Sequence, residues 1–351
     1  MTDFVARDAL HNEDGRKGAV TYSTHAISVA IPLYNKCDTV ARALHSVFAQ
    51  TVQDFEIVVV NDGSADGGEK IVAEFTDHRI RLIHQINQGA SAARNLAIRE
   101  IRSDYVAFLD ADDTWLPDHL ETLLELWKDC PEAALCATRY LFGAEGVGTR
   151  PPTIRGLPDA WTGILSDYFS IAAKSDPPLY TSALAVQRKS IDAIGGFPVG
   201  VTLGEDLLTW ARLAVQGRIA YSMKTTAIIW QRPAQLYRAK PARMPDRDDV
   251  VGRGLLALLR ECRPEQNAGL KRYIALWHKM RASTCLRLEQ SAPALKETWR
   301  AIRYDPLAWR LYAYLLLAFL PPSACRWFLR QSATRNAAGN GSHMRRPNDD
   351  R

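Results

Sequence analysis

The stretch FEIVVVNDGS at residues 55–64 decides the class of fold. Its first six residues are mostly apolar and β-branched, which is typical of a buried strand, and the Asn-Asp-Gly that follows is typical of a turn. A continuous apolar run is expected where both faces of a sheet are covered. The stretch therefore predicts a strand inside a sheet with helices on each side.

Similar segments flank this strand in both directions along the chain. The patterns predict further strands at residues 26–33, 80–84 and 105–109, and helices at 38–48, 66–75 and 89–101. Such alternation favours a mainly parallel sheet with helices on both faces, in which ligands bind at the carboxyl ends of strands. Polar clusters follow three of the strands, so these clusters are expected to converge on one edge.

The second half of the sequence is less regular. It predicts strands at residues 135–141, 180–186 and 219–230, a helix opened by Gly204-Glu205-Asp206, and helices from 250 to 329. We therefore expect five parts: a flexible leader (1–24), a nucleotide-binding half (about 25–130), an acceptor half (about 131–235), a helical C-terminal region (250–331) and a disordered tail (332–351). Residues 235–249 resemble a mobile loop.

Composition limits the class of protein. The chain has 351 residues, a net charge of +5 and 47% hydrophobic residues, as expected for a globular protein, and the mild positive charge supports an anionic ligand or membrane surface only weakly. The six cysteines form no C-x-x-C pair, which argues against a zinc site. No apolar run reaches the roughly 18 to 20 residues of a membrane span. We expect a cytoplasmic protein without a signal peptide.

The acidic residues after the strands each have two interpretations. Asp110 and Asp112 can hold Mg²⁺ or Mn²⁺ through oxygen ligands, or they form a solvated cap on the next helix. Asp62 either accepts a hydrogen bond from a base N–H or forms a turn. Glu205 and Asp206 begin a helix, where the dipole stabilises carboxylates, and one of them can also serve as a general base.

Three other side chains belong to the same edge. Tyr34 either stacks on a base or packs in the core, and Asn35 is a candidate cap for the next helix. Arg94 follows small residues that let a ligand approach closely, so it either pairs with a phosphate or base carbonyl or is an exposed residue of an ordinary helix. Their convergence at one edge is stronger evidence than any one of them.

Taken together, five segments resemble the family-2 glycosyltransferases. The segments are SVAIPLYN (28–35), FEIVVVNDGS (55–64), NQGASAARN (87–95), YVAFLDADD (105–113), and Gly195-Gly-Phe with Gly204-Glu-Asp and Trp210. They occur in the order of the family and cover residues 26–230. The resemblance implies the α/β GT-A fold, with a mainly parallel Rossmann-like sheet flanked by helices and a helical C-terminal appendage.

The resemblance also implies roles for single residues. The residues expected to bind the donor nucleotide are Pro32, Tyr34, Asn35, Asp62, Arg94 and Asp110. Pro32, Tyr34 and Asn35 would line the nucleobase pocket, and Asp62 would hydrogen-bond the base, typically uracil. Arg94 would approach the base or the phosphates, and Asp110 would face the ribose.

The expected chemistry follows from the remaining matched residues. The resemblance implies that Asp112 binds Mn²⁺ or Mg²⁺ bridging the diphosphate, and that Asp206, with Glu205 beside it, deprotonates the acceptor hydroxyl. Members of the family usually invert the anomeric configuration in a single displacement. We expect a UDP-sugar donor, a glycan or lipid-linked acceptor in cell-surface polysaccharide or lipopolysaccharide synthesis, and no nucleic-acid partner.

Two regions depart from this pattern or lie outside it. Many relatives carry a His, or a Tyr-Arg pair, after the strand that follows the acidic helix, whereas this chain has Ile-Ile-Trp-Gln-Arg at 228–232; Arg232 or Arg238 is a candidate for phosphate contact. The aromatic and arginine residues around Trp309 and Trp327 suit a helix at the inner face of the cell membrane. The alternative is that they pack on the catalytic domain.

Other classes fit the sequence less well. A nucleotidyltransferase usually has a Gly-rich, basic loop after its first strand, where this chain has IPLYNK (31–36). The G-x-G-x-x-G of dinucleotide-dependent oxidoreductases and the P-loop G-x-x-x-x-G-K-[ST] are both absent. A non-catalytic GT-A-like scaffold at the membrane remains an alternative that donor hydrolysis or transfer distinguishes.

Overall fold

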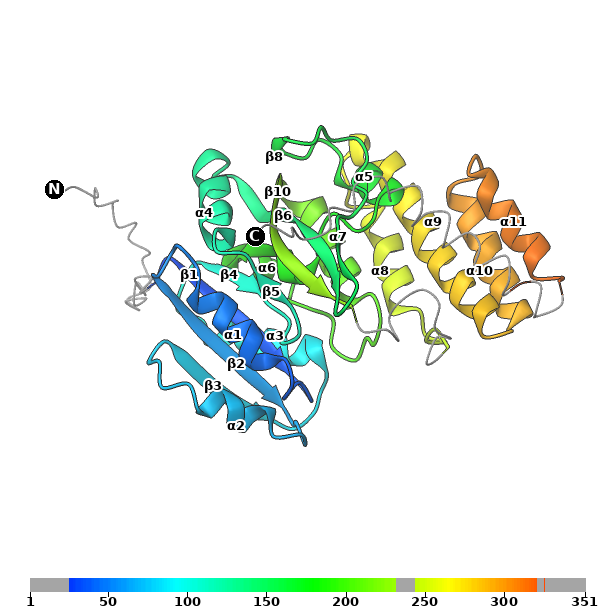
Figure 1. Cartoon of the computed structure of the whole chain (residues 1–351). Coiled ribbons are helices and arrows are strands. Elements are labelled where there is room, and N and C mark those ends of the chain that lie inside the picture. The colour runs from blue at the N-terminus through cyan, green and yellow to red at the C-terminus, as the bar shows by residue number, and fades with distance from the viewer. Residues whose placement is uncertain (1–24, 232–243, 321–324, 326–351) are drawn as a thin grey trace, which may run out of the picture.

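The computed structural model describes residues 25–231, 244–320 and 325 of the chain (Figure 1). The predicted leader (1–24) and tail (332–351), together with Arg232, Arg238 and Trp327, lie outside these residues.

One mixed sheet organises the molecule. Its strand order is β3-β2-β1-β4-β9-β6-β10-β5, with β7 paired to β6 and β8 paired to β10. The strands are β1 (Ile27–Leu33), β2 (Phe55–Asp62), β3 (Ile80–Gln85), β4 (Tyr105–Phe108), β5 (Thr114–Trp115), β6 (Ala133–Ala144), β7 (Gly148–Arg150), β8 (Thr162–Ile164), β9 (Leu184–Gln187) and β10 (Arg218–Trp230).

The first four strands of this order are parallel, as the sequence predicts. Beyond them β9 runs antiparallel to both β4 and β6, whereas β6 and β10 are parallel to each other, so the sheet is mixed from β9 onward. The strand predicted at 180–186 begins instead as a short 3₁₀ turn, η1 (Thr181–Ala183), before β9.

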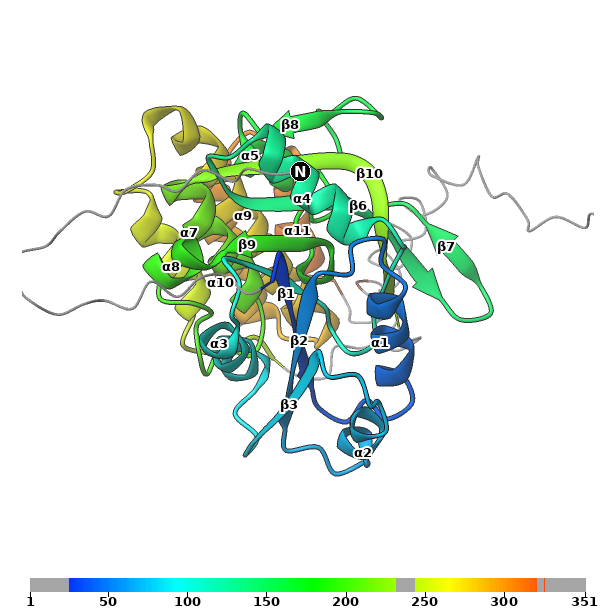
Figure 2. The ribbon, with the colours of Figure 1, turned by 90° about the vertical axis from the view of Figure 1, so that its left-hand side faces the viewer.

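Helices cover both faces of the sheet (Figure 2). The helices that lie between or beside its strands along the chain are α1 (Val40–Phe48), α2 (Gly68–Ala73), α3 (Ala90–Glu100), α4 (His119–Asp129), α5 (Tyr168–Lys174), α6 (Arg188–Ala193) and α7 (Glu205–Gln216). Figure 2 places α1 and α2 on one side of β1–β3 and α3 on the other. The cap of α1 differs from the prediction, because Thr39 rather than Asp38 holds the N-cap position and makes no side-chain cap bond.

The continuous apolar runs arise because successive side chains of a strand point to opposite faces of the sheet and both faces are covered. In β2, Val58 and Val60 join a core with the residues of α3 and α7, whereas Ile57 and Val59 join a second core with those of α1 and α4. Because both faces are buried, residues 57–60 are all apolar rather than every second one, although the run also includes the buried Glu56.

Four further helices follow the sheet. They are α8 (Val250–Leu258), α9 (Pro264–Arg287), α10 (Ser291–Tyr304) and α11 (Trp309–Leu317). The long α9 packs against α5 and α10, and α10 and α11 lie at the end of the molecule opposite β1–β3 (Figure 1). None of the helices in the described part of the chain is long and apolar enough to cross a membrane.

Candidate functional site

The acidic turn (residues 110–113) follows β4 at the carboxyl edge of the sheet. The Asp113 N–H bonds the Asp110 carbonyl at 2.9 Å and closes the turn. The carboxylate of Asp113 is buried, accepts hydrogen bonds from Ser182 Oγ at 2.6 Å and from the Trp230 N–H at 2.9 Å, and burial raises its pKa well above the usual range. Asp113 therefore fixes the turn to η1 and β10 and leaves Asp110 and Asp112 for ligands.

Asp112 faces a lysine from the neighbouring strand end. Lys36, which follows β1, donates a hydrogen bond from Nζ to Asp112 Oδ2. Arg42 on α1 donates to the Asp112 carbonyl at 3.2 Å and lies over the Trp230 ring at 4.5 Å. Asp112, the candidate metal ligand, thus lies beside two basic side chains.

Arg94 on α3 joins the two halves of the site. Its guanidinium donates to Asp110 Oδ1 at 2.7 Å and to Glu205 Oε1 at 3.4 Å. Burial alone lowers the pKa of Arg94, but the Asp110 and Glu205 carboxylates raise it above its ordinary value, so the side chain stays charged. Because Arg94 is buried, its direction is fixed, and it holds the acidic turn and the start of α7 at one edge.

Asn95, the residue after Arg94, explains why the Gly-Gly-Phe segment (195–197) needs glycine. Asn95 exchanges two hydrogen bonds of 2.8 Å with the backbone of Phe197. A Cβ at Gly196 would lie 2.5 Å from Asn95 Oδ1, so this close approach requires glycine. Phe197 also packs edge-on against Trp210, with ring centroids 5.4 Å apart. These motif residues are therefore supports beneath the site.

The start of α7 presents the second pair of carboxylates. Glu205 pairs with Arg94, whereas Asp206 accepts the Leu207 N–H at 2.7 Å and has no ion pair among the described residues. Burial, followed by the charge of Glu205, raises the pKa of Asp206 to about 6. Asp206 is therefore the carboxylate best suited to accept a proton near neutral pH.

The loops expected to hold the nucleobase are tied to one another. Asp62 Oδ1 accepts the Gln88 N–H and Oδ2 accepts the Gly89 N–H, both at 2.8 Å, and the residue is 2% exposed. Asp62 thus orders the loop before α3, and its contact with a base stays a prediction.

Asn35 and Tyr34 follow β1 at the same edge. Asn35 has φ of +50°, a conformation that Asn tolerates, and its Oδ1 accepts the Ala65 N–H at 2.9 Å. It therefore links two loops rather than capping α1. Tyr34 is exposed, so it does not pack in the core, and its place in a nucleobase pocket with Pro32 stays a prediction.

A second cluster of metal-ligand types lies among the C-terminal helices. Oxygen and nitrogen atoms of Asp249, His278 and Glu297 lie within 4.8 Å of one another. The Arg281 guanidinium stands between two of them, at 3.3 Å from Glu297 Oε2 and 3.6 Å from Asp249 Oδ1. A cation already neutralises these carboxylates, so the cluster is a buried ion-pair network that ties α9 to α10.

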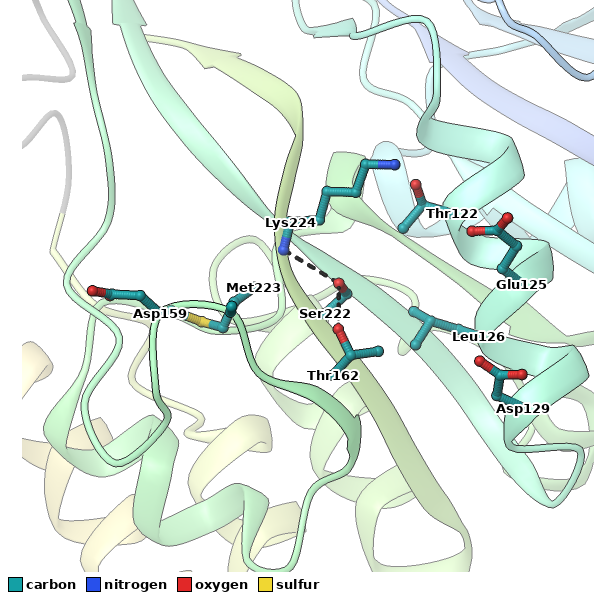
Figure 3. A pocket seen from close by; sticks show the side chains of 10 residues that line it. Thr122, Glu125, Leu126, Asp129, Asp159, Thr162, Ser222, Met223 and Lys224 are labelled. Carbon is teal, nitrogen blue, oxygen red and sulfur yellow. Dashed lines mark hydrogen bonds between the residues drawn. The ribbon is translucent and has the colours of Figure 1, made fainter.

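A cavity of about 400 Å³ lies between α4, β8 and β10. Figure 3 labels side chains that line it. Its lining includes Glu125, Asp129, Thr162 and Lys224, and none of the site residues predicted from the sequence. The candidate site therefore lies outside this cavity.

Several residues of the site escape the sequence patterns. They are Lys36, Arg42, Asp113, Ser182 and Trp230. The order of the strands contains a signal for Lys36, because β1 and β4 are neighbours and the residues after them must meet. Ser182 and Trp230 carry no comparable signal, since each reaches the turn from the less regular half.

Comparisons with known proteins identify the family of the chain. Residues 28–194 match the family model described as Glycosyl transferase family 2. The chain is 32% identical over 200 residues to the putative teichuronic acid biosynthesis glycosyltransferase TuaG of Bacillus subtilis, which covers 56% of this chain and 75% of TuaG. It is 39% identical over 127 residues to the uncharacterized glycosyltransferase YibD of Escherichia coli, covering 35% of this chain and 37% of YibD. The match thus spans little more than a third of YibD.

Two solved structures share the fold. Staphylococcus aureus TarS (residues 1–349) has a TM-score of 0.60 and 16% identity, with 92% of this chain and 94% of that chain covered. The mannosyltransferase PcManGT of Pyrobaculum calidifontis has a TM-score of 0.53 and 18% identity, with 90% and 88% covered. The predicted GT-A fold is confirmed, and the chain belongs to glycosyl transferase family 2.

Proposed function

We propose that the protein transfers a sugar from a nucleoside-diphosphate sugar to an acceptor hydroxyl. The observation that carries this proposal is the Arg94 bridge, which brings Asp110 of the acidic turn and Glu205 of α7 to one guanidinium. A candidate donor-binding group and Glu205, the neighbour of the proposed base Asp206, thereby meet at the carboxyl edge of the sheet, where ligands of such folds bind.

The donor is proposed to be UDP-linked. TarS has been solved with UDP and with UDP-GlcNAc, and PcManGT with GDP-Man and Mn²⁺, so this fold accommodates both nucleotides. In the proposed complex the base lies near Pro32, Tyr34, Asn35 and Asp62, and the ribose lies near Asp110. Arg94 directs its charge toward the phosphates or the base.

The acidic turn fits a divalent ion, Mn²⁺ or Mg²⁺. Asp112 offers carboxylate oxygens at a partly exposed turn, and hard cations prefer oxygen ligands. Such an ion, when bound, neutralises the charge that develops on the departing diphosphate. Asp112 would hold it, with phosphate and water completing its ligands, while Lys36 and Arg42 add positive charge beside it.

Asp206 is proposed as the general base of an inverting, single displacement. Its raised pKa of about 6 lets it take the proton of the acceptor hydroxyl while the sugar moves. Glu205 is held by Arg94 and therefore positions the base rather than accepting the proton.

The acceptor is proposed to be a growing cell-surface polysaccharide or lipopolysaccharide at the inner face of the cell membrane. TuaG, by its name, is a putative glycosyltransferase of teichuronic acid biosynthesis. On α11, Trp309, Tyr312 and Leu316 recur at helical spacing and are exposed, as is Phe319 in the turn that follows the helix. The guanidinium of Arg310 lies 5.5 Å from the Trp309 ring centroid. Exposed aromatic residues beside arginine suit the surface of an anionic bilayer.

Donor binding and transfer test the main proposal. Calorimetry of the full chain with UDP, GDP, dTDP and ADP, with and without Mn²⁺, is expected to show metal-dependent preference for UDP that Asp112→Ala removes. Binding of no nucleotide by folded protein would contradict the donor site and favour the scaffold alternative. Release of UDP from a UDP-sugar, faster with acceptor, separates a transferase from a nucleotidyltransferase.

Vesicle flotation tests the membrane contact. The full chain is expected to float with vesicles of 30% phosphatidylglycerol and not with phosphatidylcholine alone, and Trp309→Ser with Phe319→Ser is expected to abolish flotation. Val147→Ser, at an equally exposed turn between β6 and β7, is the matched control. Unchanged flotation of the double variant would contradict the contact.

A further inference from the structure

The ammonium group of Lys36 lies where a divalent cation would act. Lys36 Nζ is the only hydrogen-bond partner of the Asp112 carboxylate among the described residues, and the two side chains are 24% and 16% exposed. Arg42 meets the Asp112 carbonyl instead. The charge of Asp112 is therefore balanced by one flexible side chain rather than by a fixed network.

An ammonium and a divalent ion compete for this carboxylate. Both are positive, and solvent screens their repulsion less where the groups are partly buried. A metal ion arriving alone must displace Lys36 from Asp112 or bind beside it. We therefore expect the protein to bind the ion weakly without another negative ligand.

A diphosphate removes this conflict. Lysine is a compact cation on a four-carbon stem and a common phosphate ligand. Lys36 directly follows Asn35 at the carboxyl end of β1, next to the acidic turn, where the proposed donor places its phosphates. Its ammonium can exchange Asp112 for a phosphate oxygen by rotation of its own side chain.

We propose that Lys36 couples nucleotide binding to metal binding. It neutralises Asp112 until a nucleoside diphosphate takes its ammonium, and Asp112 then becomes available to the ion. The inference rests on the proposed donor site and adds its order of assembly. Because coupling between two ligands is reciprocal, Mn²⁺ must strengthen UDP binding by the same factor as UDP strengthens Mn²⁺ binding.

Four titrations of each full-length protein, wild type and variant, test this coupling. Mn²⁺ is titrated by electron paramagnetic resonance and UDP by calorimetry, each alone and each with the other present, on wild type and on Lys36→Met. Methionine keeps the length of the stem and removes the charge. We expect the variant to bind Mn²⁺ alone more tightly and UDP alone more weakly, with the coupling factor reduced about 5-fold to 150-fold, the usual range for linked sites.

The opposite effects of Lys36→Met on the affinity for Mn²⁺ and on the affinity for UDP distinguish coupling from a structural role. If Lys36 only held the acidic turn in shape, Lys36→Met would weaken Mn²⁺ and UDP alike, and that result would overturn the inference. Lys36→Arg keeps the charge and is expected to retain at least half of the coupling free energy, which is proportional to the logarithm of the coupling factor. The control variant is Lys128→Met, which changes an exposed lysine in the last turn of α4. It is expected to bind Mn²⁺ and UDP as wild type does.

The inference and the proposed function fail differently. Wild-type protein that binds neither UDP nor GDP with Mn²⁺ overturns both. Wild-type protein with normal coupling, together with a Lys36→Met variant of unchanged coupling, overturns the role of Lys36 and leaves the donor site intact.

Discussion

Two pairs of carboxylates meet at the Arg94 bridge, and their partners differ. In the acidic turn, Asp110 pairs with Arg94 and Asp112 pairs with Lys36. At the start of α7, Glu205 shares Arg94, while Asp206 accepts the Leu207 N–H and forms no ion pair with any residue that the structure describes. Carboxylates within one site thus have two different environments.

The difference separates binding from proton transfer. A carboxylate that already pairs with a cation lies in a place suited to a positively charged ligand, whereas burial raises the pKa of Asp206, which makes it ready to accept a proton. The value of about 6 for Asp206 follows from burial and the charge of Glu205. This division of roles predicts how each carboxylate responds to substitution.

The largest effect is expected from Asp206→Asn. Asparagine keeps an oxygen for the Leu207 N–H but cannot accept the proton, so kcat is expected to fall about 10²-fold to 10⁴-fold with donor affinity unchanged. Steady-state kinetics and UDP calorimetry check the two parts. Asp192→Asn on the exposed end of α6 is the control. A variant that loses donor affinity and keeps kcat would reverse the assigned roles.

The next effect is expected from Asp112→Asn. This change weakens the grip on the divalent ion, so both Mn²⁺-dependent UDP binding and turnover are expected to fall, the latter by about 10²-fold to 10³-fold, the scale for one preorganised electrostatic group. Calorimetry with and without Mn²⁺ measures the first part. Metal-dependent binding equal to that of wild type would place the ion elsewhere.

The sequence predicts the sheet and the edge at which the polar strand ends meet, while the binding roles of these residues stay predictions. Apolar strands that end in Asn-Asp-Gly or Asp-Ala-Asp specify both the sheet and the edge where the polar residues meet, because strand ends are local features. The Arg94–Glu205 contact joins residues 111 apart in sequence, and the Lys36–Asp112 contact joins residues 76 apart. No local pattern encodes which cation reaches which carboxylate.

The acceptor half was harder to predict for the same reason. Residues 180–186 are apolar and β-branched enough to suggest one strand, but Ser182 turns toward Asp113 and the Asp110 N–H, and the chain forms η1 there. The buried polar turn overrides the local β propensity of this segment. The sequence also gives no sign that α9 supports α7.

The third effect tests that support. Gly204 precedes α7 with φ of +82°, and a Cβ there would lie 2.6 Å from the Trp277 ring of α9. Gly200 has φ of +78° and nothing within 4 Å of such a Cβ. Both alanine variants carry the cost of the left-handed backbone, about 1–2 kcal/mol. Gly204→Ala is expected to lose about 1–3 kcal/mol more, from overpacking.

Denaturant unfolding of the two variants measures this difference. The Gly204→Ala variant is also expected to lose turnover, because any shift of Trp277 moves the start of α7 and with it Asp206. Equal stability of the two variants would mean that α9 yields without cost and does not position the base.

The smallest effect concerns stability and pH at Asp206 itself. Its pKa rises from 3.8 to about 6 on folding, so the folded state holds the proton more tightly than the unfolded chain does. The contribution of Asp206 to stability is therefore fully present below about pH 4 and is lost as the pH rises through about 6. Asp206→Asn avoids this loss and is expected to gain about 1–2 kcal/mol over wild type at pH 8, after discounting for solvent screening.

The two proteins are expected to have the same stability at pH 4, and the difference is measured by urea unfolding across that range. Asp192→Asn, which changes an exposed carboxylate, is expected to show no such growth with pH. The acid limb of kcat/KM in wild type is expected to fall near the same pH, because one proton governs both quantities. A stability difference that does not vary with pH would mean that Asp206 is solvated like Asp192, and the contrast between the two pairs of carboxylates would then rest on geometry alone.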